Sequence, residues 1–328
     1  MSEIMSYLFK TNAIRFCEEN KPFWYTSGKI GPYFINTHFV YGDEKQAKEL
    51  LDFIDESLSD KFTLPQKVFE KVLKQYQENE IYHQVIESMK SYISKNINVS
   101  EIDYVSGGER RDWFFSNMIA YLLEKPHISI YKDLSTVVSD SHFEKTETLQ
   151  DLNHAKVLHV ADLVTVASSY IRAWIPAIKN LGGTMRWSCV VVDRMQGGKE
   201  KMEAEGVKAY SLVNVDNTLF ETAFSNGIIN ENQLDMLKKF FKNPDETMKQ
   251  FLIDHPEFIE NALYSDEKTV KRAKLLVENN LYGLRNLGTV LCANFGDGPL
   301  RGLLGRSFAR KMGTDLWVKI YQKGLSLN

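Results

Sequence analysis

The sequence has few cysteines and no excess of basic charge, and both shortages exclude classes of protein. Three cysteines occur in 328 residues, Cys17, Cys189 and Cys292, and they form no CxxC pair. An odd number of distant thiols supports neither a disulfide framework nor a zinc site, so we expect idle thiols in a reducing compartment. The formal net charge of −3 also argues against a nucleic-acid-binding protein or one held on an anionic membrane.

Long apolar runs are missing as well. No window is apolar for long enough to cross a bilayer, and no N-terminal stretch combines basic residues with an apolar run. We therefore expect neither export nor membrane insertion, and we expect a cytoplasmic location. Hydrophobic residues make up 43% of the chain and charged residues 25%, the balance of an ordinary globular protein.

The middle of the chain, from Ile102 to about Val215, alternates short apolar stretches with helical patterns. The stretches that we expect to be strands are Ile102–Val105, His127–Tyr131, Val157–Val160, Ser188–Val192 and Ala209–Val213. Strands that alternate with helices predict an α/β fold with a doubly wound parallel sheet, whose ligands bind beyond the carboxyl ends of the strands. The apolar run Val157–Val160 predicts a buried central strand, in which His159 would be a core residue.

The flanking segments show other patterns. Aromatic runs around a Gly/Pro turn predict a β-hairpin or short meander from Phe23 to Asn36. Apolar stripes at helical spacing predict an antiparallel helix pair from about Pro65 to Asn96. Beyond Asp216 the pattern is mainly helical, with helix starts at Asn243 and Ser265 and a terminal strand at Thr314–Tyr321.

The segment from Val157 to Ser169 carries the groups that could take part in chemistry. An apolar strand leads to an acidic residue, Asp162, and a loop of small and hydroxylated residues then opens a helix. Amides at a helix N-terminus suit a phosphate, and the hydroxyls of this loop could donate further hydrogen bonds. Asp162 could accept hydrogen bonds from sugar hydroxyls. On these features alone, the segment is equally typical of sheets that bind nothing at this position.

This segment resembles the phosphoribosyl-pyrophosphate (PRPP) signature of type I phosphoribosyltransferases, and other stretches resemble the orotate branch of that family in order and spacing. The other stretches are Ser27–Asn36, Tyr131–Asp133, Gly182–Gly183, Val190–Lys199 and Gly206–Val207. The resemblance runs from Phe23 to about Val215, and the last third of the chain has no recognised counterpart. It implies an N-terminal hood (residues 1–56), a helical insertion (57–100), a phosphoribosyltransferase-like core (101–215) and a mainly helical C-terminal region (216–328).

The resemblance implies a transferase of pyrimidine biosynthesis. Such an enzyme joins orotate or a related nucleobase to PRPP and expels pyrophosphate, with Mg²⁺ bound through ligand oxygens and without a protein metal site. A homodimer is implied as well. Carried over by position, the site consists of Asp162 and Lys132 as catalytic residues, of Thr165, Val166, Ala167, Ser168, Ser169 and Arg111 for PRPP, and of Phe34, Ile35 and Arg194 for the base. Three of these have ordinary alternatives, because Arg111 could lie in a solvated turn, Arg194 could form a strand-end salt bridge, and Phe34 could belong to the core.

The sequence departs from the family pattern at several positions. Ala161 replaces the first acid of the signature, Ala167 replaces its usual glycine, and Thr26 stands where the hood usually has lysine. The stretch from Leu134 to Asn153 contains no glycine, and only His142 and Lys145 could serve as mobile-loop residues. Losing one hydrogen bond of a charged group, worth roughly 1.5–3 kcal/mol, weakens sugar binding about 10- to 100-fold.

These departures leave a second interpretation open. The chain could be a non-catalytic protein of the same fold that binds a nucleotide or sugar phosphate as a sensor, or that acts as a structural partner. Alanine at position 167 bears on the choice, because it costs about 1 kcal/mol or more if the backbone there is left-handed.

Overall fold

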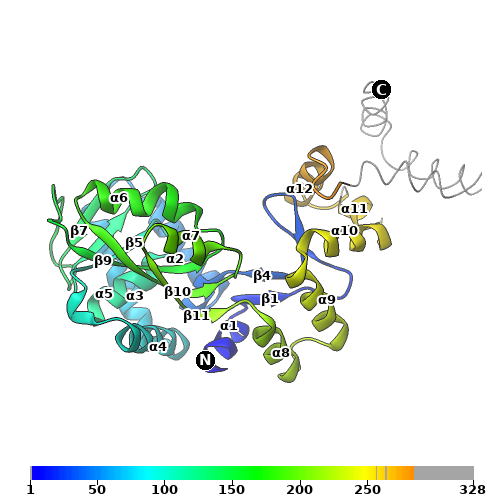
Figure 1. Ribbon diagram of the computed structural model, residues 1–328, viewed down its shortest axis with the longest axis horizontal. Coiled ribbons are helices and arrows are strands. Elements are labelled where there is room, and N and C mark those ends of the chain that lie inside the picture. Colours follow the sequence, from blue (N-terminus) through cyan, green and yellow to red (C-terminus); the bar gives the residue numbers. More distant parts are fainter. Residues whose placement is uncertain (1, 256, 263, 284–328) are drawn as a thin grey trace, which may run out of the picture. The chain divides into compact units, whose positions relative to one another are not determined.

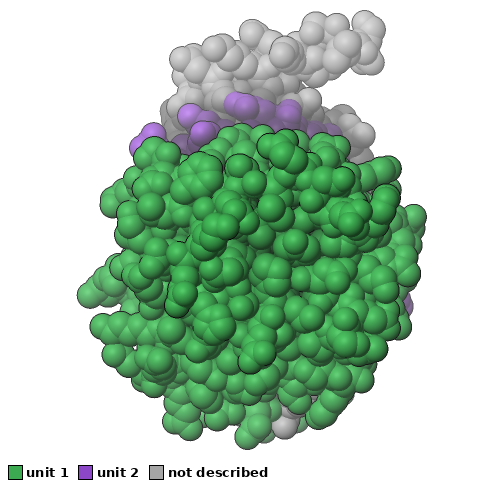
Figure 2. Space-filling view, turned by 90° about the vertical axis from the view of Figure 1, so that its left-hand side faces the viewer, with its two compact units in different colours: residues 1–16, 34–234 green, residues 17–33, 235–328 purple. Residues whose placement is uncertain are grey.

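The computed structural model describes residues 2–255, 257–262 and 264–283 and divides the chain into two compact units. Unit 1 contains residues 1–16 and 34–234, and unit 2 contains residues 17–33 and 235–328 (Figure 2). Unit 2 is therefore assembled from two segments that are distant in the sequence. Cys292 and the strand expected at Thr314–Tyr321 lie outside the described residues.

A seven-stranded sheet forms the centre of unit 1, with the strand order β11-β10-β9-β5-β6-β7-β8 (Figure 1). The strands are β5 (Tyr104–Gly108), β6 (His127–Ile130), β7 (Thr136–Ser139), β8 (Thr146–Glu147), β9 (Lys156–Val164), β10 (Thr184–Asp193) and β11 (Lys208–Asn214). The five strands from β11 to β6 run parallel, which confirms the α/β fold. The sheet is mixed and not parallel throughout, because β7 and β8 add antiparallel pairs at one edge.

Strand β9 lies inside this sheet, between β10 and β5. Residues 157–160 are fully buried, as the apolar run predicted. The strand continues beyond Val160 to Val164, so Asp162 lies within the strand and not in the loop that follows it. His159 is also fully buried, and its Nδ1 lies 2.9 Å from Ser106 Oγ, which agrees with a core histidine.

Helices cover both faces of the sheet. On one face lie α6 (Ile175–Asn180), continuing from the π-helical turn η3 (Tyr170–Trp174), and α7 (Gly198–Ala204) (Figure 1). On the other lies α5 (Trp113–Leu122), against which α3 (Leu64–Glu78) and α4 (Glu80–Asn96) pack. The helix pair predicted between Pro65 and Asn96 is thus present, and its two helices meet at Asn79, whose side chain caps α4.

The remaining elements of unit 1 flank this core. They are α1 (Ser2–Lys10), β1 (Ile14–Phe16), the 3₁₀ helices η1 (Thr37–Tyr41) and η2 (Val99–Glu101), α2 (Glu44–Ser57) and α8 (Asn217–Ser225). Strand β1 pairs with β4 (Tyr33–Ile35), and η1 follows β4 directly. Among the described helices of the whole chain, none combines the length and the apolar character that a membrane crossing requires.

Unit 2 combines a short hairpin with helices from the C-terminal third. The hairpin strands are β2 (Phe23–Trp24) and β3 (Ile30–Gly31), and the helices are α9 (Glu231–Lys242), α10 (Pro244–Asp254), α11 (Glu257–Ala262) and α12 (Glu267–Glu278). The expected hairpin is present, and so are the helix starts. Asn243 caps α10 by accepting the Glu246 N–H, and Asp266 caps α12 by accepting two backbone N–H groups.

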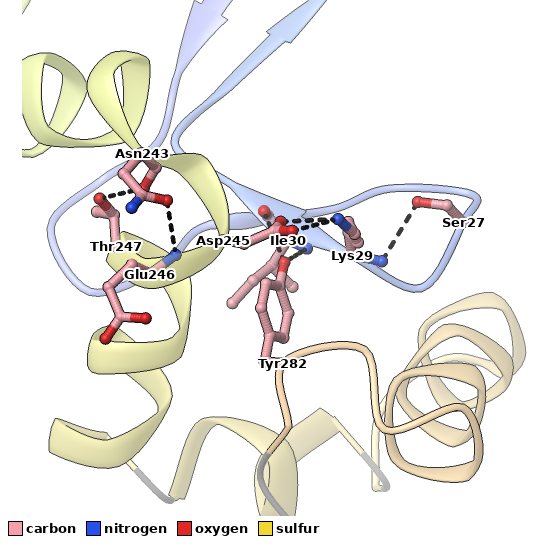
Figure 3. A network of polar contacts seen from close by, with 8 residues as sticks. All are labelled: Ser27, Lys29, Ile30, Asn243, Asp245, Glu246, Thr247 and Tyr282. Atoms are coloured by element: carbon pink, nitrogen blue, oxygen red, sulfur yellow. Dashed lines mark hydrogen bonds and ion pairs between the residues drawn. The ribbon is translucent and has the colours of Figure 1, made fainter.

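Polar contacts fix the hairpin to α10 and to the turn that follows α12 (Figure 3). Lys29 Nζ lies 2.7 and 2.9 Å from the two carboxylate oxygens of Asp245, and the Ile30 N–H donates to Tyr282 Oη at 3.0 Å. Gly28 has a φ of +83°, and a Cβ there would lie 2.8 Å from Leu275 Cβ, so this turn requires glycine. The hood motif around Gly28 therefore has a packing role against the C-terminal helices, which the sequence did not reveal.

Candidate functional site

The loop after β9 contains one residue in the left-handed backbone conformation that favours glycine. Ala167 has a φ of +53° and is buried, so an alanine occupies a left-handed position that costs an L-residue about 1–2 kcal/mol. The backbone at position 167 is therefore left-handed, the case in which the sequence predicted strain at this alanine. A Cβ at Gly198 would lie only 2.7 Å from the Thr165 carbonyl oxygen, so the start of α7 packs tightly on the loop and holds its shape.

The hydroxyl-bearing residues of this loop are accessible. Ser168 and Ser169 are exposed and Thr165 is half-buried, while Val166 is an exposed apolar residue. Helical structure begins at Ser168, so the amide groups that a first helical turn leaves unpaired lie beside these hydroxyls. The arrangement offers several hydrogen-bond donors to one anion.

Two buried carboxylates lie next to the loop. Asp162 and Asp112 are 7% and 8% exposed, and Asp112 Oδ1 accepts the Asp162 N–H at 3.3 Å. Asp112 Oδ2 accepts the Gly108 N–H at 3.0 Å and lies 3.5 Å from His159 Nε2. Burial, and next the negative charge of Asp112, raises the pKa of Asp162 to about 7, although the positive charge of Arg111 acts against this shift.

Asp112 was missed by sequence reasoning, although it stands beside Arg111 in the run that was considered. Its sequence neighbours suggested a solvated surface turn, and only the sheet brings it to Asp162, which is 50 residues away. The available signal was an acidic residue between the parallel strand β5 and the helix that follows it, near the carboxyl end of the sheet where ligands of such folds bind.

The basic candidates occupy different surroundings. Arg111 is exposed and lies close enough for its charge to act on both Asp162 and His38. Lys132 follows β6, and its ammonium group lies 3.2 Å from Glu109 Oε1, a carboxylate whose side chain is 6% exposed. Lys132 is thus held beside the β5–α5 turn by an ion pair.

The three residues expected at the base lie in two places. Arg194 is half-buried, and its backbone N–H donates to the Val164 carbonyl at 3.0 Å, which ties the Arg194 backbone to the end of β9. Phe34 and Ile35 belong to β4. Ile35 is buried, whereas Phe34 is half-buried with the Arg15 guanidinium 5.9 Å from its ring centroid.

The stretch expected to supply a mobile catalytic loop is anchored instead. It forms the β7–β8 hairpin, in which Phe143 is 1% exposed and stacks on Phe69 with ring centroids 4.5 Å apart. The Asp140 carboxylate accepts the N–H groups of His142, Glu144 and Lys145. His142 and Lys145 therefore stand on an ordered turn.

The described residues contain no cluster of three or more His, Cys, Asp or Glu side chains that could hold a metal ion. The buried carboxylates Asp112 and Asp162 are nevertheless hard oxygen acceptors, and Asp162 Oδ2 is a buried oxygen without a hydrogen-bond partner in the described part of the chain. These groups fit a magnesium ion that arrives on ligand oxygens with its water shell.

Comparison with known proteins agrees with the resemblance. No family model matches the chain. The orotate phosphoribosyltransferase of Sulfolobus acidocaldarius is 28% identical over 151 residues, which are 45% of this chain and 70% of that protein. The orotate phosphoribosyltransferase of Pyrococcus furiosus is 44% identical over 68 residues, which are 21% of this chain and only 36% of that protein.

Among solved structures, UMP synthase of Leishmania donovani has the same fold. Its TM-score is 0.50 at 15% sequence identity, and the match covers 74% of this chain and 42% of that chain. The chain is thus similar in sequence to orotate phosphoribosyltransferases and similar in fold to part of a UMP synthase. These sequence matches cover 45% and 21% of the chain and leave the rest unmatched.

Proposed function

We propose that this chain, a divergent relative of the orotate phosphoribosyltransferases, binds PRPP and transfers its phosphoribosyl group to orotate or a related nucleobase. The observation that carries the proposal is the juxtaposition of the buried Asp162 with a loop whose Ala167 keeps a left-handed backbone. An alanine is strained there, and strain of this kind persists where the surrounding structure maintains a particular loop shape.

The proposed reaction makes one bond and breaks one bond at the anomeric carbon of ribose. A ring nitrogen of the base bonds to that carbon as the carbon–oxygen bond to pyrophosphate breaks, and pyrophosphate leaves with the bonding electron pair. The ring nitrogen loses its proton to water or to the leaving group. Charge develops on the sugar and on pyrophosphate, so the protein contributes by positioning the reactants and by placing opposite charges.

The roles follow the geometry. Thr165, Ser168 and Ser169, with the amides of Val166 to Ser169, hold the 5′-phosphate, and Asp162 takes a ribose hydroxyl. Arg111 and Lys132 offer positive charge to pyrophosphate. Arg194, Phe34 and Ile35 are proposed for the base. Mg²⁺ supplies charge neutralisation on the pyrophosphate oxygens when it is bound.

Two measurements on the intact protein test this proposal. Titration calorimetry with PRPP and Mg²⁺ should give a binding isotherm, and orotate with PRPP should yield pyrophosphate and a nucleoside monophosphate. Asp162→Asn should weaken PRPP binding by roughly 10- to 100-fold, the value of one hydrogen bond to a charged group. Absence of PRPP binding in the unaltered protein would contradict the proposal.

A second candidate function is binding without catalysis. Two observations favour it: Ala161 leaves one acid of the family signature absent, and the anchored Phe143 turn stands where a mobile catalytic loop was expected. PRPP binding without pyrophosphate release, over a panel of nucleobases, would identify a sensor or structural partner. Release of pyrophosphate that depends on one nucleobase would exclude it.

A further inference from the structure

His38 lies in the short helix η1, directly after the strand that carries Phe34 and Ile35. Its side chain is 3% exposed, and its ring makes edge-on contacts with Phe39 and Phe114 at centroid distances of 4.9 and 6.0 Å. Sequence reasoning gave His38 no role, because it precedes Asp162 by more than a hundred residues and belongs to no recognised motif. The fold brings η1 against β9, at the level of Asp162.

The two side chains face each other without bonding. Nδ1 of His38 and Oδ2 of Asp162 are 4.0 Å apart, which is too long for a hydrogen bond. Both atoms are buried, and neither has a hydrogen-bond partner within the described residues. The oxygens of the neighbouring Asp112 are already engaged, since they accept the N–H groups of Asp162 and Gly108.

Buried polar atoms are rarely left unpaired, so this pair of atoms points to an absent third group. One oxygen atom placed about 2.8 Å from both atoms would subtend an angle of roughly 90° between them, which a hydroxyl accommodates. Such a hydroxyl would donate its hydrogen to Asp162 Oδ2 and accept the hydrogen of His38 Nδ1. A neutral imidazole can make this donation, and burial, followed by the charges of Arg111 and Arg110, lowers the pKa of His38 to about 3.

The space between His38 Nδ1 and Asp162 Oδ2, called the gap below, lies where a particular kind of hydroxyl would be expected. Asp162 lies two residues before the end of β9, and the phosphate loop begins at Thr165. A phosphate on the loop amides therefore leaves its attached sugar on the side of Asp162. The acid that the family would add at position 161 is absent here, so a ribose hydroxyl needs another partner.

We propose that His38 and Asp162 together bind one secondary hydroxyl of a phosphorylated ribose, with His38 as donor and Asp162 as acceptor. This inference rests on the proposed function and adds a ligand-binding residue to it. His38 takes over part of the sugar recognition that Ala161 cannot provide. A sugar phosphate in which this hydroxyl is missing or inverted would lose the contact, so the pair makes the site selective for ribose.

The experiment compares sugars and variants in the full chain. Ribose 5-phosphate and its 2-deoxy and 3-deoxy analogues are titrated calorimetrically into the unaltered protein and into His38→Asn and His38→Gln. The asparagine amide can reach the place of Nδ1, whereas the glutamine amide reaches toward that of Nε2, so the two variants form a matched pair.

One deoxy analogue should bind the unaltered protein about 10- to 100-fold more weakly than ribose 5-phosphate, the value of hydrogen bonds made with a charged acceptor. His38→Gln should bind ribose 5-phosphate more weakly by a similar factor and should discriminate much less between the two sugars. His38→Asn should keep most of the discrimination. If His38 had a purely structural role, each substitution would weaken the binding of all three sugar phosphates by the same factor.

The inference and the proposed function fail in different ways. If the unaltered protein binds ribose 5-phosphate and both deoxy analogues equally well, the gap holds a water molecule and the inference is wrong while the function stands. The inference is also wrong if His38→Gln retains full discrimination. If the unaltered protein binds neither PRPP nor ribose 5-phosphate, both proposals are wrong.

Discussion

Ala167 is an alanine in a backbone conformation that favours glycine. The sequence showed an alanine in the place of a glycine, and the backbone there has a φ of +53°. Ala167→Gly should therefore stabilise the protein, because relief of about 1–2 kcal/mol of strain exceeds the roughly 0.4–1 kcal/mol that glycine adds to the entropy of the unfolded chain. We expect the melting temperature in scanning calorimetry to rise by up to about 2–4 °C.

Ala204, an exposed residue of α7, gives the matched control. Ala204→Gly should lower stability by at most about 0.5–1 kcal/mol, the cost in a helix interior, because Ala204 is the last residue of α7. If both substitutions lower the melting temperature alike, the backbone at position 167 is not strained.

Asp162 should make the free energy of unfolding depend on pH. Its folded pKa is raised to about 7, first by burial and then by Asp112, against roughly 3.9 in an unfolded chain. Between these values the folded chain binds more protons than the unfolded chain, so the contribution of Asp162 becomes less favourable as pH rises from about 4 to 7. Asp162→Asn should thus raise the melting temperature at about pH 8 and raise it much less at about pH 5.

The buried His38 makes the free energy of unfolding depend on pH in the opposite direction. Burial lowers its pKa to about 3, so its contribution becomes more favourable as pH rises. Comparing the two proteins at each pH removes this contribution, because both contain His38. Glu205→Gln, at an exposed acid, should leave the pH dependence unchanged. An equal effect of Asp162→Asn at both pH values would show that this carboxyl is not perturbed.

At this scale the site residues that the sequence predicts beside Asp162 lie in one continuous segment, and those that only the fold brings to Asp162 were not predicted. Thr165 to Ser169 follow one another in the chain, so a motif could locate them. Asp112 and His38 approach Asp162 from separate segments, and their burial cannot be read from neighbours such as Arg111 or Asn36.

At the scale of elements, hydrophobic periodicity and caps predicted most of the fold. The buried strand β9, the helix pair α3–α4 and the capped start of α10 all appeared where their patterns placed them. The β7–β8 hairpin did not, because its strands are four and two residues long and lie within a polar stretch. Its one strong anchor, Phe143, has no periodic partner in the sequence.

Phe143→Ala should therefore destabilise the protein strongly. Removing a fully buried phenylalanine costs about 3–5 kcal/mol, and here it also frees the turn that Phe143 fastens to Phe69. Urea unfolding should report the loss, and hydrogen exchange should speed up first in β7 and β8. His142→Ala, at the exposed neighbouring position, should change stability by less than about 0.5 kcal/mol. A small effect of Phe143→Ala would mean that the turn is not anchored by its side chain.

At the scale of the whole molecule, the homodimer implied by the family stays a prediction. Apolar surface on the aromatic hood would favour such a dimer, but contacts within unit 2 reduce that surface. Trp24 stacks on Phe258 at 5.3 Å, and Tyr33 meets Phe240 edge-on at 5.6 Å, so these rings are covered by the chain's own helices. These two rings therefore offer less apolar surface to a second chain.

We still expect the protein at micromolar concentration to have twice the 37.8 kDa mass of one chain in light scattering. Trp24→Ala, in the hairpin of unit 2, should leave that mass unchanged, because its ring packs within its own chain. A mass of one chain would contradict the prediction. A change of mass with Trp24→Ala would show that the hood takes part in the dimer interface.

The discontinuity of unit 2 affects the order in which a newly made chain can fold. Ile30 and the Tyr282 hydroxyl that bonds to it are 252 residues apart, and Lys29 precedes Asp245 by 216 residues. At about 5–20 residues per second, a ribosome needs roughly 10–50 s to supply the partner of Ile30. For most of that interval the hairpin is made but lacks its cover, and residues 34–234 are completed before Tyr282 is. Slower translation of the last third would lengthen the time in which chaperones or proteases can reach the hairpin.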